Sequence, residues 1–219
     1  MGTDIHVQIE YKKDGEWHWL FKDIPKGISL SSVCPLNTNR CYDFFAMLAD
    51  VRNGSGFAGC DTGDGFIPIS EPKGLPEDIS KELLEEHEQN YLLGDHSFSY
   101  LTAKELKEYF EKNKDTTTKQ RGWVGSEGYK EFKKEGQPSS YSGGIGGQNI
   151  KHVSNKQMEK LIANGEDKNC YTQVEWGEKY QDSIGWERYW QYSNLDHLKS
   201  WTDEGKKIED IRIVFGFDS

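Results

Sequence analysis

Long apolar segments are absent from this sequence of 219 residues. No stretch approaches the roughly 18 consecutive apolar residues that a transmembrane helix requires. The opening segment, MGTDIHVQIEY, has neither the basic region nor the apolar region of a secretory signal peptide. We therefore expect a cytoplasmic protein that has no membrane partner.

Cysteines are few and scattered. The four of them are Cys34, Cys41, Cys60 and Cys170. None belongs to a C-x-x-C pair, the spacing typical of structural zinc sites, and a disulfide scaffold needs a higher cysteine density. We expect reduced thiols, and the sequence specifies neither a metal nor another cofactor.

Basic clusters are absent as well. The chain has 27 Lys and Arg against 37 Asp and Glu, a formal charge of −10, and its cations never cluster beyond a pair. Direct nucleic-acid binding needs a basic surface, so we do not expect it. The acids are interleaved with lysines, as on an ordinary solvated surface. An acidic inhibitor that mimics nucleic acid is retained as an alternative function.

Aromatic residues are plentiful, although only 34% of the residues are hydrophobic and the mean hydropathy is −0.84. Disordered chains combine low hydropathy with few aromatics. This chain has 7 Trp, 11 Tyr and 10 Phe. The composition therefore predicts a folded protein whose core depends on large rings.

Strand patterns occur at both ends of the chain. Residues 4–11 alternate, which predicts a half-buried strand, and residues 211–217 alternate again. One face of the first strand carries Ile5, Val7, Ile9 and Tyr11, and the other, polar face carries Asp4, His6, Gln8 and Glu10. Asp14-Gly15 predicts a hairpin turn that leads into a second strand within residues 17–21. A further strand is expected over residues 171–176.

Helices are expected between these strands. Spacing and turn signals predict them over residues 42–51 and 80–93 and, in one or two pieces, over 178–201. Thr102 with Glu105 and Ser154 with Gln157 have capping-box spacing, which predicts helices that begin near Ala103 and Asn155. The polar stretch 112–148 predicts short strand or turn structure, or a mobile lid. We predict a single α+β domain over 1–219, with a mostly antiparallel sheet containing strands from both termini, helices packed on it and long Gly-rich loops.

Two polar clusters are candidates for catalysis. Asp4 and His6 share one face of the first strand, and Asp95 and His96 lie in a loop that precedes a capped helix. Together they could supply metal ligands or an acid/base pair for a hydrolase. Asp4-Ile-His6 is similar to the D-x-H motif of calcineurin-like metallophosphoesterases, whereas Gly94-Asp95-His96-Ser97 departs from their G-N-H-[DE]. The alternative is that Asp4 and His6 form the solvated face of an edge strand and that Asp95 is a turn residue.

A phosphate-binding pocket is the second candidate site. The chain contains no P-loop, no nucleophile elbow and no strand-coupled G-x-G-x-x-G. Glycine-rich segments 54–65 and 143–147 could bring backbone N–H groups to a phosphate, and arginines flanking the 42–51 helix could clamp it. Aromatic rings beside these loops could stack on a base or sugar. The predicted ligand-binding residues are Arg40, Arg52, Phe57, Tyr141, Gly143 and Gly144.

Longer phrases resemble a set of uncharacterised proteins encoded by bacteriophages and prophages. They are Gly2-Thr-Asp-Ile-His6, Tyr42-Asp-Phe-Phe-Ala-Met-Leu-Ala-Asp-Val-Arg-Asn53, the Asp95-His-Ser97 cluster with Ser99-Tyr-Leu-Thr102, and Ile211-Arg-Ile-Val-Phe-Gly-Phe-Asp218. The resemblance implies a phage origin and carries no known catalytic residues. We hypothesise an accessory anti-defence protein of the host cytoplasm, engaged in host–virus interaction. It would bind a nucleotide-derived, phosphorylated small molecule, and a metal-dependent phosphodiesterase-like hydrolase is the alternative. The sequence leaves a homo-oligomer open.

Overall fold

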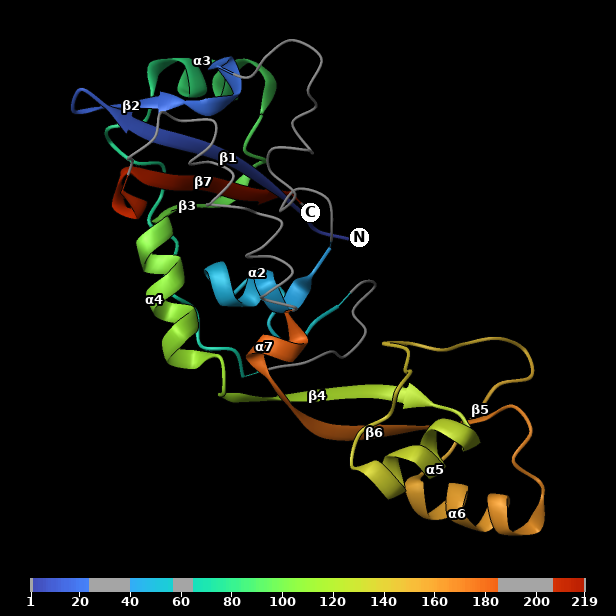
Figure 1. Ribbon diagram of the computed structural model, residues 1–219. Coiled ribbons are helices and arrows are strands. Elements are labelled where there is room, and N and C mark those ends of the chain that lie inside the picture. The colour runs from blue at the N-terminus through green and yellow to red at the C-terminus, as the bar shows by residue number, and fades with distance from the viewer. Residues whose placement is uncertain (1, 24–39, 57–64, 185–206, 219) are drawn as a thin grey trace.

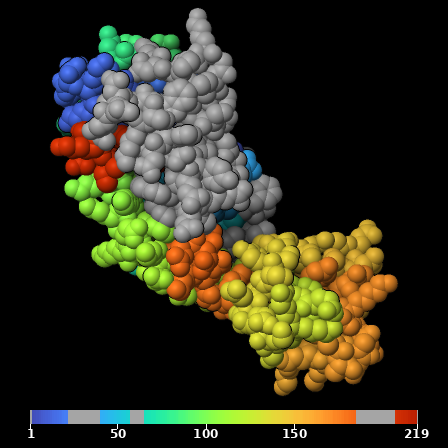
Figure 2. Space-filling model, viewed as in Figure 1, coloured from blue at the N-terminus to red at the C-terminus, as the bar shows by residue number. Residues whose placement is uncertain are grey.

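The computed structural model describes residues 2–23, 40–56, 65–184 and 207–218. Within them, two mostly antiparallel sheets and the helices packed on them form an α+β fold, which confirms the predicted class (Figure 1). The strand order is β2-β1-β7-β3 in the first sheet and β4-β6-β5 in the second. The second sheet and its helices project from the body that contains the first sheet (Figure 2). No helix in these four ranges is both long enough and apolar enough to cross a membrane.

The first sheet joins strands from the two ends of the chain, as predicted. Its strands are β1 (Asp4–Lys13), β2 (Glu16–Trp19), β3 (His96–Thr102) and β7 (Ile211–Asp218). β1 forms a hairpin with β2 around the predicted turn, and β7 pairs antiparallel with both β1 and β3. The N-terminal end of β1 therefore lies beside the C-terminal end of β7 (Figure 1).

The inner face of this sheet carries the main core. Apolar side chains of β1 and β7 pack there with α2 (Tyr42–Ala49), α4 (Ala103–Asn113) and α7 (Tyr180–Ser183). The strand residues in this core include Ile5, Val7, Ile9, Ile213, Phe215 and Phe217. The alternation predicted from β1 is therefore confirmed on its apolar side.

The outer face is also buried, which the sequence did not predict. The helix α3 (Lys81–Asn90) covers it, and Leu83 of α3 packs with Trp19, Leu93 and Val214. Gln8 and Glu10, expected on a polar face of β1, are therefore buried. β1 lies between β2 and β7, and β2 pairs with Glu10–Lys13 of β1. The segment with Asp4 and His6 pairs with β7, and both side chains are partly exposed.

The buried side chains of Gln8, Glu10 and Arg212 on that outer face have polar partners. Trp19 Nε1 donates to Gln8 Oε1 at 2.9 Å. Arg212 Nε donates to Glu10 Oε2 at 2.7 Å, and the other oxygen of Glu10 accepts from the backbone N–H of Ser80 at 2.7 Å. The Arg212 guanidinium also donates to Asp78 and lies 4.0 Å from the Trp17 ring centroid. Such pairing is what allows charged groups to remain buried.

The second sheet has its own core on one face. It consists of β4 (Thr117–Val124), β5 (Lys151–His152) and β6 (Cys170–Lys179), with α5 (Ser126–Glu135) and α6 (Asn155–Asn164) packed on it. β4 and β6 are antiparallel, whereas β5 and β6 are parallel. Val124, Tyr129, Met158, Val174 and Trp176 form the centre of this cluster.

Several element boundaries follow local signals. Both predicted capping boxes are present, so α4 and α6 begin at Ala103 and Asn155. α2 ends two residues earlier than predicted because Asp50 adopts a left-handed φ of 57°.

The polar stretch 112–148 contains a full strand and a helix, β4 and α5. Two short 3-10 helices, Leu20–Asp23 and Ile208–Asp210, complete the described elements. Beyond α7, the predicted helical region 178–201 lies outside the described residues from 185 onward.

The Arg212→Met substitution tests the buried ion pair. It would leave the Glu10 carboxylate buried without its cation, and breaking such a pair costs about 3–5 kcal/mol. We expect the free energy of unfolding from urea titration to fall by that amount. Lys119→Ala is the matched control because Lys119 and its partner Glu175 are each about half exposed, and it should cost less than about 1 kcal/mol. Equal losses in the two variants would contradict a structural role for the buried pair.

Candidate functional site

One end of the first sheet collects the predicted catalytic residues. Asp4 pairs with Asp218 in the β1–β7 register, and His96 pairs with Phe217 in the β3–β7 register. The backbone N–H of Asp95 donates to the Phe217 carbonyl at 2.8 Å. The clusters containing Asp4 and Asp95, far apart in sequence, therefore meet where β1 begins and β7 ends (Figure 1). We call this region the sheet end.

The catalytic candidates lie on opposite faces of the sheet. Residues directly opposite in an antiparallel ladder point to the same side, so Asp4 and His6 share the outer face with Asp218. His96 shares the inner face with Phe217, and their rings stack with centroids 6.0 Å apart. No group of three His, Cys, Asp or Glu side chains among the described residues is arranged to hold a metal ion. The metal-dependent hydrolase stays a prediction.

His6 and Asp218 form a pair across the β1–β7 ladder. His6 Nε2 lies 3.1 Å from Asp218 Oδ2, and Asp218 Oδ1 accepts from the backbone N–H of Asp4 at 3.0 Å. The two side chains are 35% and 45% exposed, so the pair is accessible from solvent. Sequence reasoning missed Asp218, because only the strand register reveals that the end of the last strand lies beside His6.

Gly94 packs against one edge of the His6 ring. A Cβ atom at Gly94 would lie 3.1 Å from His6 Cδ2 and only 2.5 Å from the Phe217 carbonyl oxygen. The φ of Gly94 is 79°, a left-handed conformation that favours glycine. Glycine therefore allows the loop before β3 to approach β7 and His6 closely.

Arg40 binds Asp4 through two parallel hydrogen bonds. Its Nε donates to Oδ1 at 2.5 Å and its Nη2 to Oδ2 at 2.7 Å. This contact lowers the pKa of the Asp4 carboxyl and raises that of the Arg40 guanidinium. The prediction placed Arg40 and Asp4 in different candidate sites, whereas the structure brings them together.

Arg52 reaches the same strand end from the other end of α2. Its Nε donates to the Thr3 hydroxyl at 2.8 Å, and its guanidinium carbon lies 5.8 Å from the Tyr42 ring centroid. The Tyr42 hydroxyl accepts from the backbone N–H of Thr3 at 3.4 Å. Because successive side chains of a strand alternate in direction, Thr3 and Asp4 bring Arg52 and Arg40 to opposite sides of the chain.

Asn53 closes the ends of the predicted Gly-rich loop. Its amide Nδ2 donates to the Phe66 carbonyl at 2.9 Å, and its Oδ1 accepts from the Phe66 N–H at 3.4 Å. Asn53 and Phe66, which flank this segment, therefore lie side by side next to Arg52. Phe57, predicted to bind the ligand, lies outside the described residues, as do residues 58–64.

The remaining predicted ligand-binding residues lie on the second sheet. Tyr141 packs over Gly122 and edge-on to Trp176, with ring centroids 4.7 Å apart. The Ser142 hydroxyl donates to the Gly144 carbonyl, and the Ser142 backbone pairs with Trp123 of β4. The segment with Tyr141, Gly143 and Gly144 therefore lies along β4 of the second sheet. Arg40 and Arg52 lie at the sheet end.

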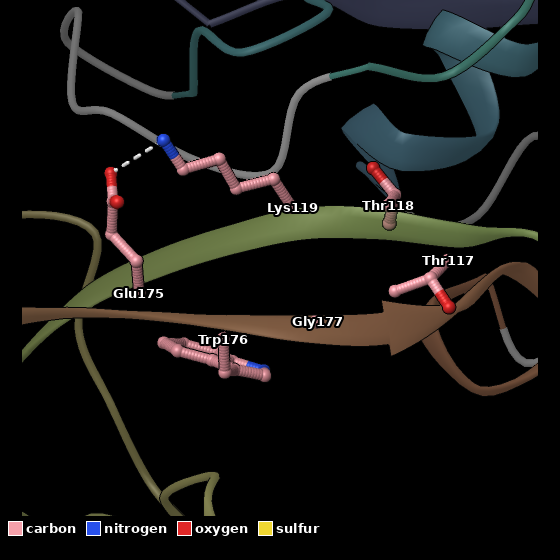
Figure 3. Close-up of a pocket in the computed structure, with 6 residues that line it drawn as sticks. All are labelled: Thr117, Thr118, Lys119, Glu175, Trp176 and Gly177. Carbon is pink, nitrogen blue, oxygen red and sulfur yellow. Dashed lines mark ion pairs between the residues drawn. The ribbon is translucent and has the colours of Figure 1, made fainter.

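A hollow of about 410 Å³ lies on the β4–β6 pair (Figure 3). Its lining consists of Thr117, Thr118, Lys119, Glu175, Trp176 and Gly177. Lys119 and Glu175 form an ion pair of 3.0 Å across the two strands. None of the predicted site residues lines this hollow, so it does not enlarge either candidate site.

A polar cluster links α2 to the second sheet. Asp43 in the first turn of α2 accepts from Gln120 Nε2 of β4 at 2.9 Å and from the Ser183 hydroxyl of α7. Burial raises the pKa of Asp43. It also raises the pKa of Glu178, and the charges of Asp43 and Asp182 act on Glu178 in the same direction. The cluster therefore holds carboxyl groups that resist ionisation where the two sheets meet.

The Asp43→Asn substitution tests this effect. In the unfolded chain the Asp43 carboxyl has the ordinary aspartate pKa near 3.8, and in the folded protein its pKa is higher. Ionisation of Asp43 therefore disfavours folding. Wild type should therefore lose stability relative to the variant as pH rises above about 4 through the raised pKa. Urea unfolding of both proteins at about pH 4 and about pH 7 measures the change.

Asp115→Asn is the control with the opposite sign. Lys179 lowers the pKa of Asp115, so this carboxylate favours folding above its ordinary pKa and loses that effect as pH falls. Wild type should therefore gain stability relative to Asp115→Asn as pH rises. A pH-independent difference between wild type and Asp43→Asn would contradict the raised pKa.

Comparison with protein-family models, with curated proteins and with solved structures finds no match for the chain. The likeness to bacteriophage and prophage proteins therefore stays a prediction. Function has to be inferred from the residues at the sheet end.

Proposed function

We propose that this protein binds a small phosphorylated, nucleotide-derived ligand at the sheet end. The observation that carries the proposal is the convergence of Arg40 and Arg52 on the first residues of β1. The whole sequence has five arginines, and these two approach the strand from the two ends of α2. An oriented guanidinium is a common means of holding a phosphate in a chain of net negative charge. Because the two guanidinium groups lie on opposite sides of the chain, each would contact a different group of the ligand.

The Arg40–Asp4 contact supports anion recognition. A guanidinium presents the same planar pair of N–H donors to a carboxylate and to a phosphate. The two side chains are 49% and 47% exposed, so a phosphate can reach Arg40 from solvent. On this proposal, the Asp4 carboxylate occupies the position that a phosphate group takes in the complex.

Tyr42 adds an aromatic surface beside Arg52. The ring lies against the guanidinium, and its hydroxyl contacts the backbone of Thr3. A guanidinium next to an aromatic face suits a ligand that combines phosphate with a base or sugar. This juxtaposition supports a nucleotide-derived ligand over inorganic phosphate alone.

The biological role that we propose follows from the sequence resemblance. The phrases that include Asp4, His6, Arg52 and Asp95 resemble those of uncharacterised proteins encoded by bacteriophages and prophages, and this resemblance is a prediction. A phage accessory protein that captures a nucleotide-derived signal in the host cytoplasm would oppose a host defence. Loss of the signal from solution, as bound ligand recovered after denaturation or as its cleavage product, would support such a role.

Arginine variants test the binding proposal. We expect cyclic dinucleotides or ADP-ribose derivatives to bind the wild-type chain in calorimetry and to raise its thermal midpoint. Arg40→Ala and Arg52→Ala should each weaken binding by about 10-fold to 100-fold, because each removes charge-assisted hydrogen bonds worth about 1.5–3 kcal/mol. Asp4→Asn should tighten binding, because it removes the carboxylate that competes for Arg40.

Arg121→Ala is the matched control. Arg121 lies on β4 of the second sheet, 3.7 Å from Glu175, so its removal changes the net charge equally without altering the sheet end. If Arg121→Ala weakened binding as much as Arg40→Ala, general charge rather than a site would explain the affinity. If no phosphorylated probe bound and a host nuclease copurified instead, the result would favour the acidic inhibitor.

A further inference from the structure

Contacts along one edge of the imidazole ring fix the orientation of His6. The Nε2–Cδ2 edge faces Asp218 and Gly94, since Nε2 is 3.1 Å from Asp218 Oδ2 and Cδ2 is the atom nearest to Gly94. Nδ1 and Cε1 lie on the opposite edge of the imidazole. The His6 side chain is 35% exposed.

Asp218 selects the tautomer of a neutral His6. A carboxylate accepts hydrogen bonds, so the contact places the ring proton on Nε2 and leaves the Nδ1 lone pair as a proton acceptor. The backbone N–H of Asp4 holds the other oxygen of Asp218, which fixes the carboxylate across the two strands. The nearby Asp4 carboxylate is engaged by Arg40, so the two acids have separate partners.

We propose that His6 and Asp218 form a proton-transfer pair that hydrolyses a phosphodiester bond in the ligand. This inference rests on the proposed phosphate binding, because Arg40 would hold the phosphate close to His6 through the position now taken by Asp4. In this reaction His6 is the catalytic residue, because its Nδ1 lone pair would exchange protons with the reacting atoms. Asp218 is a positioning residue that acts through His6.

The reaction consumes one water molecule. His6 Nδ1 takes a proton from water as the water oxygen forms a bond to phosphorus. The bond between phosphorus and the leaving oxygen breaks, and the leaving alkoxide takes the proton from Nδ1. The products are a phosphomonoester and an alcohol, and His6 returns to its initial state without a metal ion or redox partner.

Turnover of bis(para-nitrophenyl) phosphate in the presence of a chelator tests this reaction. We expect release of para-nitrophenolate by wild type. His6→Gln should lower kcat by about 100-fold to 10,000-fold, the usual contribution of a general base. Asp218→Asn should lower kcat with little change in KM, because it disturbs the ring tautomer rather than phosphate binding.

Matched substitutions elsewhere separate chemistry from folding. His152→Gln changes an exposed histidine on the second sheet, and Asp115→Asn changes an exposed acid paired with Lys179. Both should retain wild-type turnover. Loss of activity in His6→Gln with an unchanged thermal midpoint supports catalysis, whereas equal losses in the control variants overturn it.

The ring tautomer gives a readout that needs no ligand. Long-range ¹H–¹⁵N spectra of the full chain in mildly alkaline buffer should show His6 with its proton on Nε2, and Asp218→Asn should shift that population toward Nδ1. The His6→Gln spectrum assigns the signal. A proton on Nδ1 in wild type would overturn the proposed role of Asp218.

The binding and hydrolysis proposals fail in distinguishable ways. If phosphorylated probes bind in an Arg40-dependent manner and neither they nor the nitrophenyl ester are cleaved, the hydrolysis is overturned and binding stands. Activity abolished by the chelator would also overturn this metal-free reaction. If nothing binds and nothing is cleaved, both proposals are overturned.

Discussion

The buried pair of Arg212 and Glu10 is the contact on which the first sheet depends. The two residues lie opposite each other in the β1–β7 ladder, and Asp4 with Asp218 lies further along the same ladder. A slip of one residue would turn every side chain of the strand to the other face. Arg212 would then lose Glu10, and Asp218 would leave His6. The ion pair in the sheet interior therefore stabilises the register that builds the sheet end.

The sheet end is formed by parts that are remote in sequence. β1 contributes Asp4 and His6, β7 contributes Asp218, and the segments flanking α2 contribute Arg40 and Arg52. Their backbones are held by the sheet and by a helix packed on it, whereas the side chains at the strand end remain partly exposed. This combination of a rigid framework and accessible polar groups is typical of binding sites.

Local patterns account for the predictions that succeeded. The alternation in residues 4–11, the Asp14-Gly15 turn and the two capping boxes each act within a few residues, and all are present in the structure. α5 was missed because its sequence is largely polar and its apolar contribution to the core is small, with Tyr129 as its buried residue. Gln8 and Glu10 were misplaced because α3, a distant helix, covers their face of the sheet.

The sequence by itself determined the α+β class, the strands at both termini and most helix starts, because hydrophobic period and capping are local properties. Tertiary structure alone decided which candidate residues meet. Strand register brought Asp218 to His6 and separated the faces of His6 and His96, and chain packing brought Arg40 to Asp4 while Tyr141 remained on the second sheet. Register and packing depend on contacts between segments far apart along the chain, and no local pattern encodes such contacts.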